Sequence, residues 1–494
     1  MSAHGTQSFA RHTGLVAIGQ AAVKSTQLVL AIVLVRMLDP DGWNAAAFLL
    51  SIYLAGTTIG SLNVQHGIVF FLPRVDVTEQ RSLVVRTMGL LAAVGLAIAL
   101  ALVVAAPALT GGRLADADQI PALGLAIALE LPAACVPMAL IAVERYGAAA
   151  VWDLLGTAIF MAATIVPVAA GLGVPGLVAG LCVAGALRSL IGLVVVRHLL
   201  GSGRPLPVKT LMAQLSYSLP LGLTVAVAML NRLTDKWFVA AFRPGDFGVY
   251  AVAAQEIPLL AVLPYAGGAA LVTALVAGFR DDDIATARTH WLHLTMTMSA
   301  VVVPVGMVVV IVAPELLHLV FTPEFERGVL SFQLFTLVTL HRVAEYGMLL
   351  RAAGRTRDLL QVAAATLAAN IVLAGIGAYV AGMTGASLGT VIASGIGWLV
   401  ALRKIAAVLE VPVRDAFAWR SWLTCVGLAI AAALATVVVV ERLETGSGIR
   451  LLLKVVVFGA LFATGYRAWR RTPHSTIPAA VVVPERRPLA TSSS

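Results

Sequence analysis

One long apolar stretch, residues 215–250, reads LSYSLPLGLTVAVAMLNRLTDKWFVAAFRPGDFGVY. A helix needs about 20 apolar residues to cross a bilayer, and this stretch is longer. Its interior nevertheless contains Arg232, Asp235 and Lys236. A charge near the bilayer centre costs roughly 2.5–3.5 kcal/mol on insertion scales, so such side chains are retained mainly where they face a partner or a hydrated cavity. The stretch therefore predicts a membrane-spanning helix that carries a functional charged site.

The composition of the chain extends this interpretation. The 494 residues are 60% hydrophobic and 12% charged, with a mean hydropathy of +0.93, whereas about a quarter of the residues in a globular domain are charged. We therefore expect an all-α polytopic membrane protein. The three cysteines, Cys135, Cys182 and Cys425, lie in apolar runs, so neither a disulfide framework nor a metal site is expected. The polar first residues do not resemble a cleavable signal.

Apolar runs of about 20 residues predict fourteen transmembrane helices. The connections between them are short, and the Pro-, Ser-, Thr- and Arg-rich residues 472–494 are predicted to form a disordered cytoplasmic tail. The predicted spans are residues 13–37, 43–72, 83–110, 119–143, 148–171, 174–197, 211–241, 247–278, 290–313, 328–350, 358–381, 384–408, 417–440 and 449–469.

The distribution of lysine and arginine predicts the orientation. If the N-terminus is cytoplasmic, 22 of the 34 basic residues fall on the cytoplasmic side and six on the opposite side. Cytoplasmic loops carry the excess of basic residues, so both termini are expected in the cytoplasm of a bacterium, with the chain in its inner membrane. The remaining six basic residues lie inside spans and are candidates for function, namely Lys24, Arg188, Arg232, Lys236, Arg342 and Lys454.

Three matches in similar register indicate an internal repeat. Pro40 and Pro244 lie in similar segments 204 residues apart, Asp153-Leu-Leu and Asp358-Leu-Leu are 205 apart, and the glycine segments at 176–180 and 385–389 are 209 apart. Six spans per repeat give both halves the same orientation, as in parallel-repeat transporters. We therefore expect a first lobe at 1–205 (spans 1–6), a second lobe at 206–410 (spans 7–12) and two further spans at 411–471.

Several segments resemble the polysaccharide (Wzx-type) flippase family of the multidrug/oligosaccharidyl-lipid/polysaccharide exporter superfamily. The residues that carry the resemblance are Ser216-Tyr-Ser-Leu-Pro220, Asp235, Arg243-Pro-Gly-Asp-Phe-Gly-Val-Tyr250, Asn370-Ile-Val-Leu, Gly385-Ala-Ser-Leu-Gly-Thr390 and Leu34-Val-Arg-Met-Leu-Asp-Pro-Asp-Gly42. The similarity covers nearly all of spans 1–12. Arg243 departs from the family pattern, which usually has an apolar residue and glycine there.

The resemblance implies two six-helix lobes that move an undecaprenyl-diphosphate-linked oligosaccharide from the inner to the outer leaflet by alternating access. Its partners would be that substrate, membrane lipids and a polysaccharide polymerase with its chain-length machinery. Such a substrate presents a diphosphate and a polar sugar chain, neither of which crosses hydrocarbon unaided. We therefore expect a hydrated, net-positive lumen.

Two predicted helices supply the polar groups for this lumen. In span 1, Gln20, Lys24 and Gln27 recur at spacings of four and three residues and share one helix face. In span 7, Arg232 shares a face with Asp235 and Lys236. These six residues are the predicted substrate-binding groups, because lysine binds phosphate as a point charge and arginine as a fork. An alternative is that the charges pair within the bundle without touching substrate.

Other ionisable groups in the spans have weaker assignments. Arg342, beside His341 in span 10, can pair with Glu345 at a spacing of three residues and is a further substrate-binding candidate. Glu256 and Glu345 are candidates for coupling transport to proton or sodium movement. Glu130, Asp153 and Arg188 are expected to be structural, and no cofactor is expected. The polar group Asn63, Gln65 and His66 is expected to pack between helices.

The sequence leaves several functions open and disfavours others. A peptidoglycan-precursor flippase, a cation-coupled small-molecule exporter and a scaffold for polysaccharide assembly remain alternatives. The chain lacks a G-x-x-x-x-G-K-S/T motif, and its loops are too short to carry the catalytic groups of a polymerase. Neither an enzyme nor a nucleic-acid-binding protein is expected.

Overall fold

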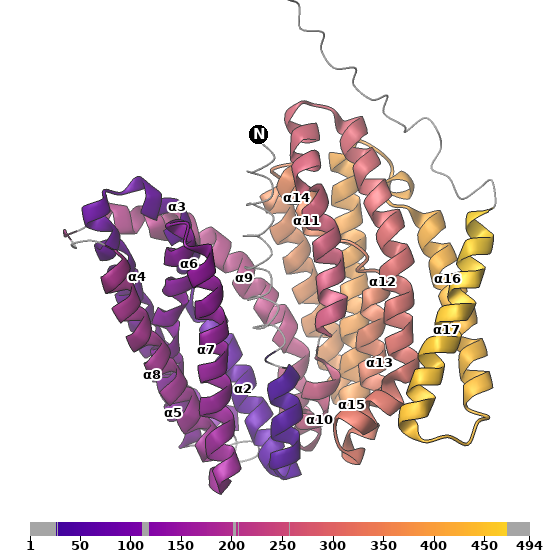
Figure 1. The fold of residues 1–494 in the computed structure, drawn as a ribbon, viewed down its shortest axis with the longest axis horizontal. Coiled ribbons are helices and arrows are strands. Elements are labelled where there is room, and N and C mark those ends of the chain that lie inside the picture. The colour runs from indigo at the N-terminus through magenta and orange to yellow at the C-terminus, as the bar shows by residue number, and fades with distance from the viewer. Residues whose placement is uncertain are drawn as a thin grey trace, which may run out of the picture. The chain divides into compact units, whose positions relative to one another are not determined.

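The computed structural model of the protein describes residue 26 and residues 28–110, 118–200, 204–205, 207–255 and 257–471 (Figure 1). Within these ranges every regular element is a helix. The long helices are α2 (Pro40–Gly60), α4 (Val77–Thr110), α5 (Gln119–Glu130), α7 (Tyr146–Pro167), α8 (Gly173–Leu199), α9 (Val208–Phe242), α11 (Pro258–Arg280), α12 (Ile284–Val320), α15 (Thr356–Val408), α16 (Trp419–Val440) and α17 (Ser447–Arg470). The shorter α-helices are α3 (Val64–Phe71), α6 (Cys135–Ala142), α10 (Phe247–Ala253), α13 (Val329–Leu337) and α14 (Tyr346–Ala352).

The helices confirm the predicted fold class. Among the described residues, nine helical segments are long and apolar enough to cross a membrane. Two of them, Tyr146–Leu199 and Thr356–Val408, have 54 and 53 residues, which suffices for two crossings each. Large apolar side chains such as Leu100 and Val104 of α4 are mostly exposed, as expected of groups that face lipid. The chain is an all-α, multi-pass membrane protein.

Local sequence explains where these helices begin and bend. Asp39 caps α2 by accepting a hydrogen bond from the Gly42 backbone N–H at 3.2 Å, and Pro40 occupies the first turn. Between α7 and α8, Gly171 adopts a φ of 84°, a left-handed conformation that glycine tolerates best. Gly382 (φ 59°) reverses α15 in the same way. Two bends therefore separate the two predicted pairs of spans.

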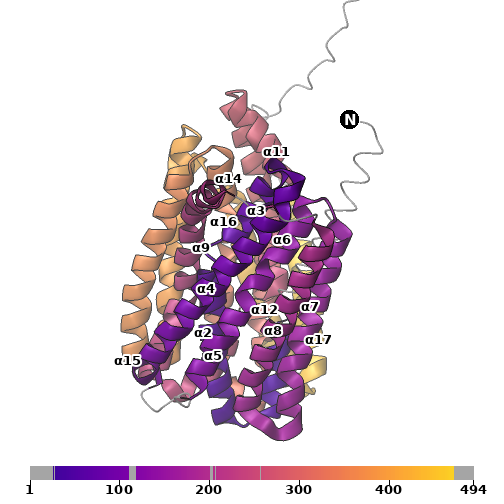
Figure 2. The same ribbon diagram turned by 90° about the vertical axis from the view of Figure 1, so that its left-hand side faces the viewer.

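The first compact unit comprises Met1–Pro258, Leu317–Phe332 and Thr366–Ala393. In it α4 packs against α5, α5 against α8 and α8 against α7, and Figure 2 shows these helices side by side. The α5–α8 crossing is close, because a Cβ on Gly185 would lie 2.9 Å from the Glu130 backbone nitrogen. Helix α9 packs along α2 and α3 in the same unit.

The second compact unit comprises Leu259–Leu316, Gln333–Ala365 and Ser394–Ser494. Its C-terminal helices α16 and α17 form a hairpin, visible in yellow and orange in Figure 1. Aromatic side chains anchor this hairpin: Trp422 Nε1 donates to the Leu340 carbonyl at 2.6 Å, and the Trp422 ring lies 5.4 Å from that of Trp398. The start of α16 is thereby fixed to the segment before α14.

The boundaries of these units differ from the predicted lobes. Both α12 and α15 contribute residues to each unit, whereas the lobes were placed by the sequence repeat at 1–205 and 206–410. The compact units are defined by contacts between residues, whereas the predicted lobes are defined by the internal sequence repeat. The lobes therefore stay a prediction.

Candidate functional site

Asp235 is the one acidic residue of α9, and it is buried. Its side chain is 2% exposed, and it lies in the C-terminal third of the helix. The Tyr250 hydroxyl donates a hydrogen bond to Asp235 Oδ2 at 2.8 Å, and the Lys236 ammonium lies 3.8 Å from the same oxygen. A buried carboxylate needs such partners, because an isolated charge in a low-dielectric interior costs several kcal/mol. Helix α10 supplies the tyrosine by folding back directly after α9.

A chain of polar side chains continues from Tyr250 to α15. The Tyr250 hydroxyl lies within hydrogen-bonding reach of Ser387 and Thr390, and the Thr390 hydroxyl donates to Asn370 Oδ1 at 3.0 Å. Asn370 Nδ2 in turn donates to the Asn231 backbone carbonyl at 2.9 Å and to its side-chain oxygen at 3.2 Å. The network therefore begins and ends on α9, one turn apart.

This Asp235 network, defined as Asn231, Asp235, Tyr250, Asn370, Ser387 and Thr390, joins three helices of the first unit. Tyr250, Asn370 and Ser387 are fully or almost fully buried. Buried polar side chains in a membrane protein hold helices in one arrangement when they are satisfied.

Arg232 and Lys236 differ in environment despite their shared helix face. Arg232 is exposed, whereas the Lys236 side chain is 14% exposed. Lys236 Nζ donates to the Arg232 backbone carbonyl at 3.1 Å, in addition to its pairing with Asp235. Of the three predicted charged side chains, that of Arg232 is thus the most accessible to a ligand.

Four predicted site residues cannot be placed. Gln20, Lys24, Gln27 and Glu256 lie outside the described residues. Their predicted roles in substrate binding and coupling therefore stay predictions.

The charged group of span 10 differs from the predicted arrangement. Glu345 pairs with Arg351 instead of Arg342. The reason is that residues 341–345 are not helical, since they lie between the short helix at 338–340 and α14, and the spacing of three residues no longer places two side chains together. His341 hydrogen bonds to Ser394 at 3.1 Å, and its ring centroid lies 5.3 Å from that of Trp398, so it is a packed side chain of the second unit.

Two further ion pairs lie within the apolar helices. In the first unit, Arg188 of α8 pairs with Glu130 of α5, as expected for structural charges. In the second unit, Lys454 Nζ of α17 lies 2.7 Å from Glu315 Oε1 of α12 and donates to the Ile311 carbonyl at 3.1 Å. The sequence identifies Lys454 as a candidate functional residue but predicts no partner for it.

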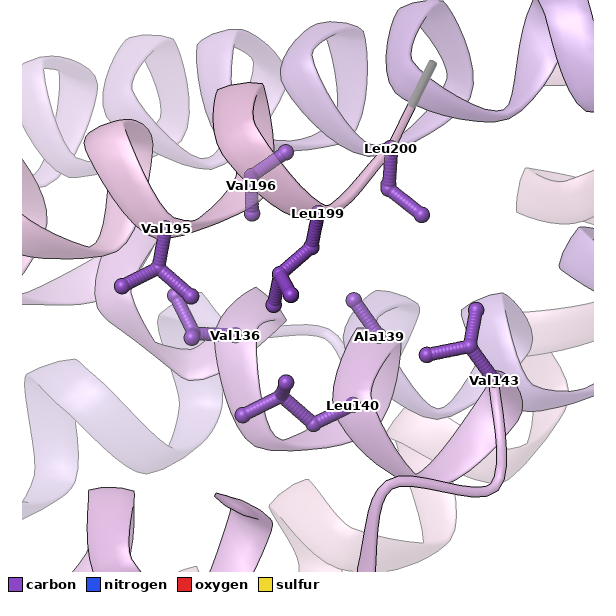
Figure 3. Close-up of a pocket in the computed structure, with 8 residues that line it drawn as sticks. All are labelled: Val136, Ala139, Leu140, Val143, Val195, Val196, Leu199 and Leu200. Carbon is purple, nitrogen blue, oxygen red and sulfur yellow. The ribbon is translucent and has the colours of Figure 1, made fainter.

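A small cavity between α6 and the end of α8 does not qualify as a ligand site (Figure 3). Its lining is entirely apolar, with Val136, Leu140 and Val196 among the side chains that converge on it. Its volume is about 10 Å³, too little for even one well-bonded water molecule. It is a packing gap between two helices.

Comparison with known proteins places this architecture in a family. The sequence profile of the family described as polysaccharide biosynthesis protein matches residues 33–330 of this chain, which include α9, α10 and three of the six residues of the Asp235 network. The chain therefore belongs to this family. The resemblance that the sequence motifs indicated is confirmed. None of the curated proteins matches the chain in sequence.

Solved structures of transporters share the fold. The lipid II flippase MurJ, in an inward closed conformation, matches with a TM-score of 0.70 at 13% identity, and the match covers 92% of this chain and 100% of MurJ. An inward-facing multidrug resistance MATE transporter of the MOP superfamily matches with a TM-score of 0.56 at 15% identity, covering 78% of this chain and 96% of that one. A MOP superfamily transporter from Pyrococcus furiosus gives 0.55 at 15% identity, covering 81% and 95%.

These similarities establish the fold of this member of the polysaccharide biosynthesis protein family, which is that of flippases and transporters. At 13–15% identity they carry no information on its substrate. The MurJ match extends over more of this chain than the MATE match, 92% against 78%.

Proposed function

We propose that the protein is a flippase that moves an undecaprenyl-diphosphate-linked oligosaccharide from the cytoplasmic to the outer leaflet, for assembly of a surface polysaccharide. The observation that carries the proposal is its membership of the polysaccharide biosynthesis protein family together with a transporter fold. Translocation of a lipid-linked sugar is the step of polysaccharide synthesis that needs a membrane transporter. The polar head group cannot cross hydrocarbon alone.

The charged groups of α9 support a diphosphate substrate. Arg232 is exposed and can present its guanidinium to phosphate oxygens with the planar geometry that favours phosphate. Lys24 and Lys236 are proposed to add positive charge, with Gln20 and Gln27 binding sugar hydroxyls. Asp235 is proposed to hold Lys236 in place through their contact at 3.8 Å.

The proposed transport runs outward by alternating access across a bacterial inner membrane, with both termini in the cytoplasm. The excess of basic residues in the connections on one side supports this orientation. Coupling to proton or sodium influx, with Glu256 or Glu345 involved, and handover to a polysaccharide polymerase belong to the same proposal. The protein would catalyse no covalent step and is therefore proposed to be a transporter and not an enzyme.

A peptidoglycan-precursor flippase is the second candidate. It is a candidate because the lipid II flippase MurJ has the same fold over nearly the whole chain, with a TM-score of 0.70, although a shared fold at 13% identity does not identify the substrate. The family match favours polysaccharide instead. Deletion of the gene separates the two, since a peptidoglycan-precursor flippase is required for growth and loss of a surface-polysaccharide flippase is usually tolerated.

Export of surface polysaccharide in Lys24→Ala and Arg232→Ala strains tests the proposed site. Each substitution removes a positive charge from the proposed diphosphate contact, and a charge-assisted hydrogen bond contributes enough for a roughly tenfold loss of export. Lys209→Ala is the matched control, because Lys209 is an exposed base in the first turn of the same helix α9.

The strains are compared at equal amounts of membrane-inserted protein. The Lys209→Ala strain is expected to export normally. Normal export in both the Lys24→Ala and the Arg232→Ala strain would overturn the assignment of these bases to the substrate.

A further inference from the structure

A second cavity lies where three connections of the first unit meet. Its volume is about 300 Å³, which is at the lower end of the range for small-molecule sites and corresponds to roughly ten water molecules. It is lined by the segment before and at the start of α2, by the start of α10 and by the connection that follows α12. Because α2 begins and α12 ends here, the cavity lies at the ends of membrane helices, on the face that the Lys/Arg distribution predicts to be outside.

Hydrogen bonds between the three connections build this cavity. Trp43 Nε1 donates to the Gly248 carbonyl at 3.0 Å, and Asn44 Oδ1 accepts from the Gly248 N–H at 2.6 Å. Arg36 donates to the Leu319 and Val320 carbonyls at 3.1 and 2.9 Å, which caps the end of α12. The lining is therefore fixed by backbone contacts before any ligand arrives, which lowers the entropic cost of binding.

The lining combines N–H donors, a carboxylate acceptor and apolar surface. Arg36 and Arg327 each have five N–H donors, and their hydrogen bonds within the protein leave some of these donors available. Glu324 is exposed and forms no hydrogen bond or ion pair with the described residues. Trp43, Val249 and Phe325 supply the apolar part of the lining.

This combination of groups fits a sugar ring better than it fits phosphate or a metal ion. A pyranose has hydroxyl groups that donate to the Glu324 carboxylate and accept from the guanidinium groups, and its C–H faces fit the apolar side chains. Phosphate presents mainly acceptor oxygens and carries negative charge, so the Glu324 carboxylate would repel it. A metal ion would meet one carboxylate only, and the described residues contain no cluster of three or more metal-ligating side chains.

We infer that this cavity, lined by Arg36, Asn44, Thr322, Glu324 and Arg327, binds one pyranose unit of an oligosaccharide on the outer face of the protein. The inference rests on the proposed function for its ligand class. The Arg36-Met-Leu-Asp-Pro motif lines the cavity, and Gly245 and Asp246 of the Arg243-Pro-Gly-Asp motif hold Arg327. A sugar held here would be a head group that has already crossed the membrane.

Binding of free sugars to the purified full chain in lipid nanodiscs tests the inference. Saturation-transfer NMR is recorded with glucose, galactose, mannose, N-acetylglucosamine and glucuronate, and with inorganic phosphate as a competitor. At least one sugar is expected to bind saturably without displacement by phosphate. Glu324→Gln is expected to weaken its binding roughly tenfold, because a hydrogen bond to a charged group is lost, and Thr322→Trp is expected to abolish it by filling the cavity.

Glu326→Gln is the matched control, because Glu326 lies two residues from Glu324 but pairs with His318 at 2.8 Å and does not line the cavity. It is expected to bind like the wild type. Absence of saturable binding by every sugar, displacement by phosphate, wild-type binding by Thr322→Trp, or equal loss in both glutamate variants would overturn the inference. Transport of the lipid-linked substrate is measured separately in vesicles, so transport without sugar binding refutes the cavity alone, and sugar binding without transport refutes the proposed function.

Discussion

Replacing Asp235 with alanine is expected to reduce transport at least tenfold, the largest loss for any substitution in α9. The carboxylate accepts the Tyr250 hydrogen bond at 2.8 Å and lies 3.8 Å from the Lys236 ammonium. Its removal takes away the acceptor of the Tyr250 hydrogen bond and one counter-charge of the mostly buried Lys236 ammonium, and the loss of such buried interactions costs about 1–3 kcal/mol or more. We therefore expect lower thermal stability together with the loss of transport.

Asp235→Asn separates the two effects. Asparagine keeps an oxygen that accepts from Tyr250 but removes the negative charge, so this variant is expected to be more stable than Asp235→Ala and still lose transport. Thermal unfolding in detergent and transport in vesicles are the measurements. Transport at the wild-type rate by Asp235→Ala would show that the Asp235 network has no part in function.

Replacing Lys454 with alanine is expected to destabilise the protein by about 3–5 kcal/mol, the cost of breaking a buried ion pair by removing one partner. The Lys454 and Glu315 side chains are 2% and 7% exposed, with 2.7 Å between Nζ and Oε1. The substitution leaves the Glu315 carboxylate buried next to apolar helices. The melting temperature of the purified variant is the measurement.

A double variant tests whether the ion pair itself stabilises the protein, or whether the protein is destabilised only when one partner is removed. Lys454→Met combined with Glu315→Leu removes both charges and is expected to recover most of the lost stability, because well-packed apolar residues often replace a buried pair without cost. Glu441→Gln is the control, since Glu441 lies 3.9 Å from Lys454 but is 59% exposed and should contribute little. A Lys454→Ala variant as stable as the wild type would contradict this account.

The helical fold could be predicted from the sequence because apolar runs of fixed length leave few alternatives in a membrane. The bends at Gly171 and Gly382 separate the same spans that the hydropathy separated. The limits of single helices were harder to predict. Span 9 was predicted to end at residue 313, whereas α12 continues to Val320, and Glu315 was therefore missed as a partner for Lys454.

The candidate site was only partly predictable. Charge inside an apolar run identified Asp235 and Arg232, because burial of charge is costly wherever it occurs. The α15 members of the Asp235 network could not be derived in the same way, since Asn370 is 139 residues from Asn231 and such contacts depend on how helices pack. The Arg342–Glu345 pairing failed because it assumed a continuous helix where the chain is irregular.

The most direct test of the central claim is movement of a fluorescent undecaprenyl-diphosphate-linked oligosaccharide between leaflets of vesicles that contain the purified protein. The account predicts faster movement than in protein-free vesicles, faster movement than for a labelled peptidoglycan precursor, and a roughly tenfold slower rate for Arg232→Ala. Equal rates for the oligosaccharide lipid with and without the protein would contradict it.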